Sequence, residues 1–290
     1  MALAVGAGIA GSAAVSIAAA QERDVDFSVA DEMPNGWEVS ITPYGWMAGI
    51  SGDLGVAGRT LQINANFYDL LTKSDYLIPV MGYTELRKDR FAIFADGFYT
   101  QMKFSKSNMI TKNPFAKANL TLKSKAAVTQ TLAFAEGGAS YEVARWQGPM
   151  GDTGLEVLGG ARYWYSSIDT SLKINGTVKF GNLGLKKKGK YAVAKSGDID
   201  WVDPVIGARI SQEFANMQKF ELLGDIGGFG VGSEFSWQVY AGYTKGYQVG
   251  QAILAWTLGY RALAANYEAK SGNSLDFVLH GPIAGFTVRW

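Results

Sequence analysis

The feature that most constrains this chain is a period-two alternation of apolar and polar residues, repeated in long runs. In the run 201–210, for example, Val202 and Ile206 share one face, whereas Asp203 and Arg209 share the other. Such alternation is typical of β-strands with one apolar face, and no run shows a helical period. The sequence therefore predicts an all-β fold of about ten strands, with eight or twelve as the alternatives. The expected strands are 37–50, 76–88, 91–104, 125–144, 153–168, 198–213, 218–229, 235–246, 250–264 and 275–290.

The connections between these runs alternate between longer and shorter. The long ones are 51–75, 105–124 and 169–197. This alternation is typical of a closed up-and-down antiparallel transmembrane β-barrel, which has tight periplasmic turns and larger outer loops. We therefore expect residues 37–290 to form one such barrel with both ends of the chain on the periplasmic side. The stretches 59–67 and 171–180 also alternate, so we expect them to add a hairpin or to extend strands above the membrane.

Lipid offers the backbone no hydrogen-bond partner, so a membrane-spanning sheet must close on itself and turn its apolar faces outward. The polar faces then line the lumen, and here they carry charges of both signs. We expect these charges to pair, which leaves the lumen mostly filled or only narrowly open. The predicted lumen-facing residues are Glu38, Glu85, Arg87, Asp96, Glu142, Glu156, Arg162, Asp203, Arg209, Glu221, Asp225, Arg261 and Arg289.

Aromatic residues gather near both ends of the expected strands. Trp146 and Trp290 stand at the end with the short turns, whereas Tyr44, Trp46 and Trp201 stand near the opposite end. Two such belts are typical of a lipid-facing barrel. The alternative is that these side chains fill the core of a water-soluble barrel.

The first twenty residues carry no charge and end in three alanines. We interpret residues 1–20 as a secretory signal peptide, although the basic residues that normally open such a signal are missing. A membrane-spanning helix and an Ala/Gly-rich leader are the alternatives. Residues 21–36 are acidic and aperiodic, so we expect an N-terminal tail before the barrel.

Composition excludes several kinds of site. The chain has no cysteine, which excludes thiolate metal sites and cysteine nucleophiles. His280 is the single histidine, which excludes the usual multi-histidine zinc site. Lys and Arg number 27 against 26 Asp and Glu, so no overall charge points to nucleic acid. We expect no cofactor, no metal and no nucleic-acid partner.

Two local patterns are reminiscent of active-site motifs. Asp276 and His280 are four residues apart and could act on a serine of a neighbouring strand, as in a lipid-modifying hydrolase. No nucleophile elbow accompanies them, so we expect no catalytic residues. The glycine-rich stretch 227–232 has the density of a phosphate-binding loop, but the nucleotide fingerprint requires a helix to follow. A strand is expected there, so a hairpin with glycines at positive φ is the better interpretation.

Lysines concentrate in two of the long connections, where acidic residues are missing. No acid occurs between Gly97 and Ala135 or between Thr170 and Gly197. Because ammonium groups attract phosphate, we expect contact with the phosphorylated lipopolysaccharide of the outer leaflet, or attraction of anionic solutes to a pore mouth. The alternative is a solvated loop that lysine keeps soluble. The candidate contact residues are Lys106, Lys112, Lys117, Lys186, Lys187, Lys188 and Lys190.

Several blocks resemble the conserved segments of one bacterial family. The blocks are WEVSITPYGWM at 37–47, the stretch 85–99, LGGARYWY at 158–165, the stretch 201–210 and GDIGGFGVGSEFSWQ at 224–238. In them the chain is similar to a bacterial outer-membrane β-barrel family, akin to the small OmpA-type and porin-like barrels. The resemblance implies this fold and an outer-membrane location, and it transfers no catalytic residue. The C-terminal IAGFTVRW also resembles the signal read by the barrel-assembly machinery, with Gly285, Val288 and Trp290 at the expected places.

The sequence thus predicts an integral outer-membrane protein without enzymatic activity, either an envelope structural protein or a narrow porin-like channel. A barrel-embedded lipid-modifying hydrolase is one alternative. A surface adhesin or binding module that uses the lysine-rich loops is another. The expected partners are outer-membrane lipid, lipopolysaccharide and the barrel-assembly machinery. The oligomeric state is left open, because lipid-facing and subunit-facing apolar surfaces look alike in a sequence.

Overall fold

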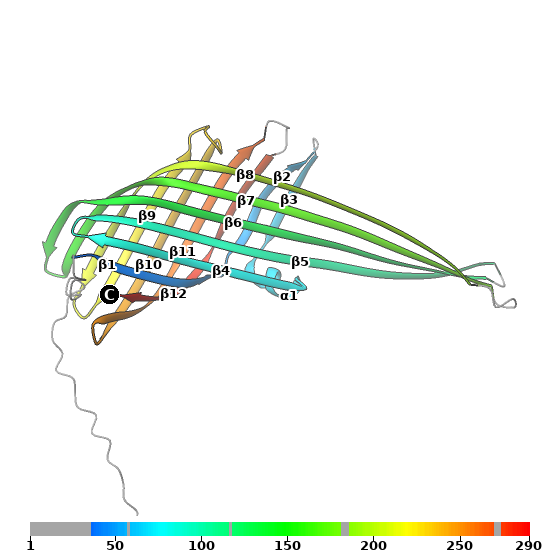
Figure 1. Cartoon of the computed structure of the whole chain (residues 1–290), viewed down its shortest axis with the longest axis horizontal. Helices are drawn as coiled ribbons and strands as arrows, with labels where there is room; N and C mark the ends of the chain where they lie inside the picture. The colour runs from blue at the N-terminus through cyan, green and yellow to red at the C-terminus, as the bar shows by residue number, and fades with distance from the viewer. Residues whose placement is uncertain (1–35, 57–58, 116–117, 181–185, 270–273) are drawn as a thin grey trace, which may run out of the picture.

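The computed structural model describes residues 36–56, 59–115, 118–180, 186–269 and 274–290 (Figure 1). The signal peptide expected at 1–20 and nearly all of the expected tail lie outside the described residues. Over the described ranges, no helix has the length and apolarity that crossing a membrane requires.

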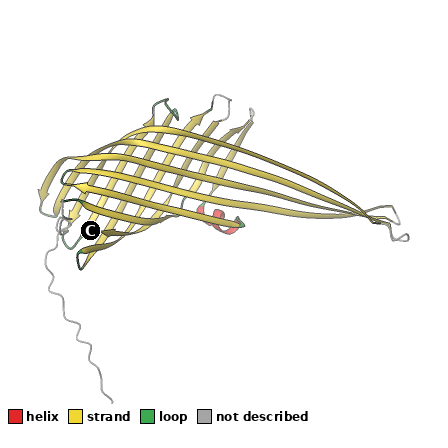
Figure 2. Ribbon diagram, viewed as in Figure 1, coloured by secondary structure: helices red, strands yellow, loops and turns green. Residues whose placement is uncertain are grey.

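Antiparallel β-strands make up most of the described chain (Figure 2). The strands are β1 (Glu38–Trp46), β2 (Gly49–Val56), β3 (Arg59–Ala65), β4 (Tyr76–Lys88), β5 (Phe91–Phe115), β6 (Ala118–Gly148), β7 (Gly151–Phe180), β8 (Lys186–Phe214), β9 (Gln218–Gly228), β10 (Phe235–Val249), β11 (Ala252–Glu268) and β12 (Ser274–Arg289). One short helix, α1 (Phe67–Lys73), separates β3 from β4. The Asn66 side chain caps this helix by accepting a hydrogen bond from the Asp69 amide.

Hydrogen bonding joins ten of these strands into a ring, which we call the barrel (Figure 1). The ring runs from β1 through β4 and on in chain order to β12, which pairs back with β1 along Ile283–Arg289. The first part of β12, Ser274–His280, pairs instead with β2, which pairs with β3. The β2–β3 hairpin is therefore an addition at one end of the ring. We call this end the loop end, and the opposite end, where β4 turns into β5, the turn end.

The strand number is twelve rather than the expected ten. The first expected strand, 37–50, is interrupted at Met47 and Ala48, where the chain passes from β1 to β2. At this break the backbone of Met47 runs close to β12: a Cβ at Gly281 would lie 2.1 Å from the Met47 carbonyl oxygen, so only glycine fits there. The next segment then pairs as β3 instead of looping, as the alternation at 59–67 predicted.

Four strands are much longer than expected. β5, β6, β7 and β8 contain 25 to 31 residues each, so the prediction of loops at 105–124 and 169–197 is largely wrong. The four strands pair with one another far beyond the barrel and leave its loop end as one sheet (Figure 1). We call this part, the described residues within 104–128 and 170–199, the projecting sheet. Alternation continues through much of both segments and lets the ladders extend along them, although the register of the β5–β6 ladder shifts between Lys112 and Phe115.

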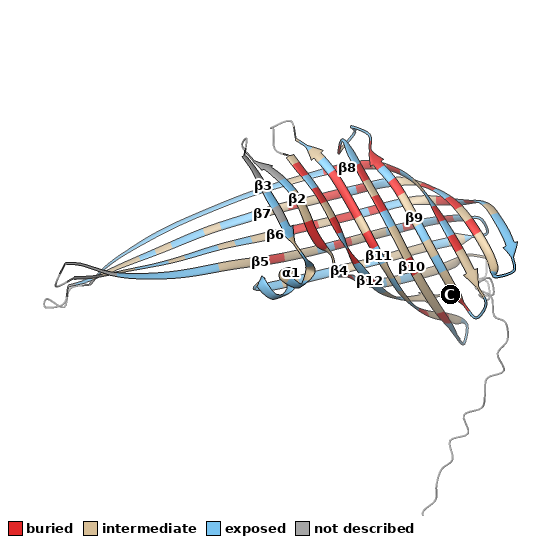
Figure 3. Ribbon diagram, turned by 180° about the vertical axis from the view of Figure 1, so that it is seen from behind, coloured by how far each residue is buried: buried red, intermediate tan, exposed pale blue. Residues whose placement is uncertain are grey.

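The alternation places apolar side chains outside the barrel and polar side chains inside it. Val202, Ile206 and Leu222 are 49%, 57% and 43% exposed, whereas Asp203 and Arg209 are 0% and 7% exposed. Buried residues follow the barrel part of the strands, whereas the projecting sheet is mostly exposed (Figure 3). Water-soluble proteins show the opposite arrangement, because there the large apolar side chains are the buried ones.

Aromatic side chains occupy both faces of the barrel wall. Trp146 and Tyr163 are exposed on the outside, Trp146 near the turn end and Tyr163 nearer the loop end of the barrel part of its strand. Trp46 and Trp201, expected in the outer belt, instead lie inside and are 4% and 6% exposed. The reason is the strand period, since Trp201 has the same parity as the inward-facing Asp203.

Candidate functional site

The interior of the barrel contains three layers of side chains, and the layer nearest the turn end is an ionic cluster. Arg209 on β8 lies 2.6 Å from Glu156 on β7 and 3.0 Å from Glu85 on β4. Arg87 lies 2.9 Å from each of the same two carboxylates. Ser140 on β6 donates a hydrogen bond of 2.9 Å to Glu156. Two cations and two anions from three strands thus neutralise one another across the lumen.

The second layer is centred on Arg162, whose side chain is fully buried. Its guanidinium lies 2.7 Å from Glu136 on β6 and 2.8 Å from Asp225 on β9. A buried charge is stabilised only when it is paired and hydrogen-bonded, and here two carboxylates from opposite sides provide that pairing. The ionic bridge therefore joins β6, β7 and β9 through the interior.

Arg261 on β11 completes the second layer on the other side of the lumen. It lies 2.8 Å from Asp96 and donates a hydrogen bond of 2.7 Å to the side-chain oxygen of Gln238. The Tyr44 hydroxyl accepts from Arg261 at 3.1 Å and donates to Asp96 at 2.8 Å. Strands β1, β5, β10 and β11 are thus connected by one hydrogen-bonded set.

The third layer, nearest the loop end, is aromatic. Its members are Trp46, Phe98, Phe134, Trp164, Trp201, Tyr267 and Phe277. Trp164 is 0% exposed and stacks on Trp201 with 5.7 Å between the ring centroids. The Arg261 guanidinium lies 5.0 Å from the Phe134 ring, so a cation–π contact links the second layer to the third. These rings fill the lumen where a pore would open to the outside.

Asp203 ties the loop between β9 and β10 to the aromatic layer. Its carboxylate accepts hydrogen bonds from the Ser233 amide at 2.6 Å and the Ser233 hydroxyl at 2.8 Å. It also accepts from the indole nitrogens of Trp164 and Trp201, at 3.1 and 3.3 Å. The glycine-rich stretch before Ser233 is a hairpin loop with Gly228 at φ +87°, which confirms the hairpin interpretation.

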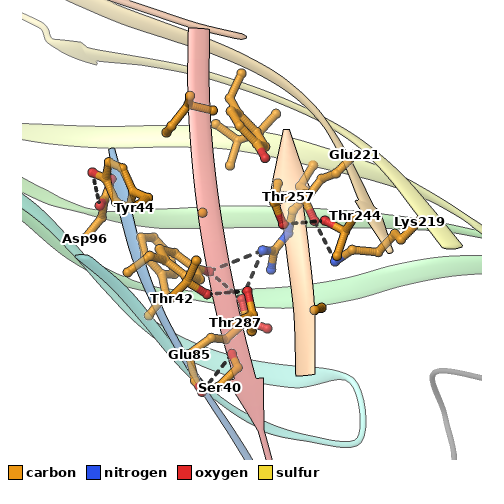
Figure 4. A pocket seen from close by; sticks show the side chains of 18 of the residues that line it. Ser40, Thr42, Tyr44, Glu85, Asp96, Lys219, Glu221, Thr244, Thr257 and Thr287 are labelled. Atoms are coloured by element: carbon orange, nitrogen blue, oxygen red, sulfur yellow. Dashed lines mark hydrogen bonds and ion pairs between the residues drawn. The ribbon is translucent and has the colours of Figure 1, made fainter. Parts of the chain in front are cut away.

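A cavity of about 180 Å³ lies between the turn end and the second layer (Figure 4). Hydroxyl pairs line it: Thr42 and Thr287 lie 2.8 Å apart, as do Thr244 and Thr257. Its lining reaches as far as Arg261. Small-molecule sites usually exceed about 300 Å³, so this space suits water or a small ion better than a larger solute.

All the predicted lumen-facing residues lie on the inner faces of their strands. Besides the two ionic layers, Glu38 lies 3.9 Å from Arg289 at the turn end. Lys219 pairs with Glu221 at 2.9 Å beside the cavity. Arg145 pairs with Glu142 at 2.8 Å.

The sequence interpretation did not place three residues in the interior: Glu136, Tyr44 and Gln238. Glu136 was overlooked because Gly and Ala surround it and blur the alternation, although its parity matches that of the inward-facing Phe134. Gln238 was missed because an uncharged polar side chain carries a weak signal. Tyr44 was expected in the outer aromatic belt, but its hydroxyl lies inside, between Asp96 and Arg261. Parity with a neighbouring charged residue would have found them, as Gln238 pairs directly with Asp225 across β9 and β10.

The structure separates the two residues of the hydrolase interpretation. His280 is exposed on the outside of β12, and its Nδ1 lies 2.7 Å from the Tyr260 hydroxyl. Asp276 lies 3.4 Å from the side-chain nitrogen of Asn266. His280 is thus oriented by a tyrosine instead of a carboxylate, and it faces away from the lumen.

The projecting sheet has two unlike faces. Lys125 is directly opposite Lys173, and Lys123 is opposite Asn175, which is opposite Lys190. Residues paired in this way point to the same side of a sheet. Lys173 has the parity of the outward-facing aromatics of β7, so these four lysines share the face that continues the outside of the barrel, which we call the lysine face.

The opposite face of the projecting sheet continues the lumen side of the barrel and is largely apolar. Ile110, Leu122, Leu172 and Val193 lie on it and are exposed. Charged residues are few on this face, and those present stand on its two outer strands, β5 and β8. The sequence showed two lysine-rich segments, and the pairing of the strands sorted their residues into two chemically different surfaces.

The seven candidate contact lysines are divided by this arrangement. Lys188 and Lys190 lie on the lysine face, whereas Lys106 and Lys187 lie on the apolar face. Lys117 lies outside the described residues, as do the side chains of Lys112 and Lys186. The sequence reading left Lys123, Lys125 and Lys173 out of the candidates, although they stand at the centre of the lysine face.

No protein-family model and no curated protein sequence matches the chain. Among solved structures, Ail, the attachment invasion locus protein of Yersinia pestis, is 8% identical, with 88% of this chain and 99% of that chain covered and a TM-score of 0.25. A Pseudomonas aeruginosa FadL homologue is 8% identical, with 88% and 90% covered and a TM-score of 0.29. The translocator domain of autotransporter NalP from Neisseria meningitidis is 9% identical, with 88% and 89% covered and a TM-score of 0.27. These likenesses are distant, so the function must follow from the geometry of the barrel itself.

Proposed function

We propose that this protein is an integral outer-membrane β-barrel with a sealed lumen, and that it holds the projecting sheet at the cell surface. The observation that carries the proposal is the inside-out distribution of side chains along the barrel wall. Soluble monomers rarely expose a contiguous apolar patch above a few hundred Å². Here large apolar side chains are exposed on β4 to β12, around the ring. A ring of paired strands also satisfies its own backbone, as a lipid environment demands.

The sealed lumen favours an anchor over a porin-like channel. An aqueous channel needs a continuous polar path, whereas here the aromatic layer lies across the barrel beyond the two ionic layers. The cavity near the turn end stops at the second layer. The outward position of His280 likewise supports a protein without enzymatic activity.

A surface-binding role is favoured by the projecting sheet. Its strands are hydrogen-bonded from the barrel wall outward, so the sheet is a rigid continuation of the anchor. We propose that its lysines contact the anionic lipopolysaccharide of the surrounding leaflet. Its opposite face carries exposed apolar side chains, among them Ile110, Leu122 and Leu172.

The side chains of the last strand, β12, support the proposal that the barrel-assembly machinery recognises this strand. Val288 and Trp290 share the outward parity of the exposed Phe286. Gly285 faces inward, where an added Cβ would lie 3.1 Å from a methyl group of Thr42. An apolar outward stripe on a terminal strand is a surface that another β-protein can read.

The proposal is tested by membrane fractionation, heat-modifiable migration and planar-bilayer conductance of the full-length protein. We expect the protein in the outer-membrane fraction, faster gel migration of the unboiled sample, and no stepwise conductance. Recovery in the soluble fraction would contradict the membrane barrel. Stable open conductance with normal membrane insertion would contradict only the sealed lumen.

A further inference from the structure

The lysine face of the projecting sheet brings like charges together in neighbouring positions. Lys125 and Lys173 are directly opposite each other on β6 and β7, which places their Cβ atoms about 5 Å apart. Lys123 and Lys190 occupy the next row, on either side of Asn175. All four side chains are exposed.

These lysines have no counter-ion among the residues that the structure describes. None of the ion pairs formed within the described residues includes Lys123, Lys125, Lys173 or Lys190. The acids of the same face lie nearer the barrel, and Asp169 is four residues from Lys173, about 13 Å along an extended strand. That distance exceeds the Debye length of about 8 Å at physiological salt, so these acids do little to neutralise the two rows of lysines. Like charges directly opposite each other destabilise a sheet unless an external anion neutralises them.

We propose that the lysine face binds phosphate groups of the lipopolysaccharide that surrounds the barrel. Rows about 5 Å apart across the strands and about 7 Å apart along them let two ammonium groups approach one phosphate from either side. The sheet leaves the barrel wall without a linker (Figure 1), so the lysine face directly continues the outer face of the wall, which the proposal places in the leaflet. Binding at the lysine face depends on the proposed outer-membrane location, and it identifies lipopolysaccharide phosphate as the group that is bound. Binding to the surrounding lipopolysaccharide also explains why the lysines lie on the face that continues the outer surface of the barrel.

Two matched variants of the full-length protein test this site. The first replaces Lys125, Lys173 and Lys190 with Gln and removes three charges from the lysine face. The second replaces Lys106, Lys187 and Lys195 with Gln, which removes three charges from the opposite face of the same sheet. Binding of phosphorylated lipopolysaccharide and of the same material after dephosphorylation is measured on detergent-solubilised protein at fixed salt.

The expected result is a loss of affinity of about a hundredfold in the lysine-face variant, because each of the three lysines near an anionic surface contributes about fivefold. The control variant should lose less than threefold. The unsubstituted protein should bind the dephosphorylated material at least tenfold more weakly than the phosphorylated material.

Three outcomes would overturn the site. One is an equal loss in both variants, which would indicate attraction by total charge alone. Another is equal affinity for phosphorylated and dephosphorylated lipopolysaccharide. The third is tighter binding of heparin or DNA than of lipopolysaccharide, which would assign the face to a different polyanion. Heat-modifiable migration of each variant keeps this test separate from the membrane proposal: a folded, inserted protein that fails to bind contradicts only the site.

Discussion

At the scale of single residues, the interior is organised by charges that have no access to bulk water. Arg162 and Asp203 are both completely buried. Arg162 is stabilised by two carboxylates, whereas Asp203 receives only neutral donors, from one serine and two tryptophans. The two residues therefore have different tasks. Arg162 joins strands across the lumen, and Asp203 holds a loop against the aromatic layer.

Replacing Arg162 with Met should lower the free energy of unfolding by about 3–5 kcal/mol, because Glu136 and Asp225 are left buried without their cation. Urea unfolding in lipid vesicles, followed by tryptophan fluorescence, measures the change. The triple variant R162M/E136Q/D225N should recover most of the loss, since no net charge then remains buried. If the free energy of unfolding of R162M lies within about 1 kcal/mol of that of the unsubstituted protein, the ion pairs of Arg162 contribute little to stability.

Replacing Asp203 with Ala should release the β9–β10 loop. Hydrogen bonds to a charged acceptor contribute about 1.5–3 kcal/mol, so the Ser233 amide should exchange its hydrogen at least tenfold faster. Hydrogen exchange followed by mass spectrometry reads this amide. Asp200 lies on the same strand and points outward, so D200A is the matched control and should leave the loop protected. Unchanged exchange at Ser233 in D203A would contradict the anchoring role.

At the scale of elements, each barrel strand has an apolar outer face and a polar inner face, which is the reverse of the arrangement in a water-soluble barrel. Leu222 on β9 is exposed, and its neighbours Glu221 and Leu223 face inward. In the projecting sheet the same period continues, but the outward face becomes rich in lysine. The change from aliphatic to cationic side chains along β6 and β7 therefore indicates where the strands leave the membrane.

Replacing Leu222 with Arg should destabilise the protein by about 2–4 kcal/mol, because an arginine on the lipid face near the middle of the bilayer must be desolvated. Ser196 on β8 is exposed on the lysine face of the projecting sheet, so S196R is the control and should have almost no effect. The free energy of unfolding in vesicles compares the two. Equal, small effects would indicate that the outer face of β9 contacts water.

At the scale of the whole molecule, the barrel and the projecting sheet use the same four strands for different purposes. The ring closes through β1 and β12, on the side of the barrel opposite the extended part of β6 and β7. The three interior layers also lie within the ring. The barrel should therefore fold without the projecting sheet.

A variant in which residues 105–127 and 171–194 are each replaced by Asn-Gly turns should still assemble. The flanking residues remain paired in the native register, Phe104 with Val128 and Thr170 with Lys195. A two-residue Asn-Gly loop closes such a pair readily. We expect heat-modifiable migration and membrane fractionation to be retained and lipopolysaccharide binding to be lost. A variant that accumulates as unfolded protein would show that the projecting sheet is needed for assembly.

The sequence by itself determined which side of each strand is apolar and where several strands begin and end. The expected strand 76–88 coincides with β4, and the charged residues expected in the lumen all lie on inner faces. Both results depend on alternation, which is a local property: successive side chains of a strand point to opposite sides whatever the strand pairs with.

Only the tertiary structure decided which residues meet. Glu85 and Arg209 form an ion pair although 124 positions separate them along the chain. The split of the first strand at Met47, the stacking of Trp164 on Trp201 and the sorting of the lysines onto one face of the projecting sheet likewise depend on pairing between distant segments. Register is a cooperative property of the whole ring, because shifting one strand by one residue would exchange its inner and outer faces. The sequence therefore shows which face of each strand is apolar, whereas only the pairing of all the strands shows which side chains lie together on one surface.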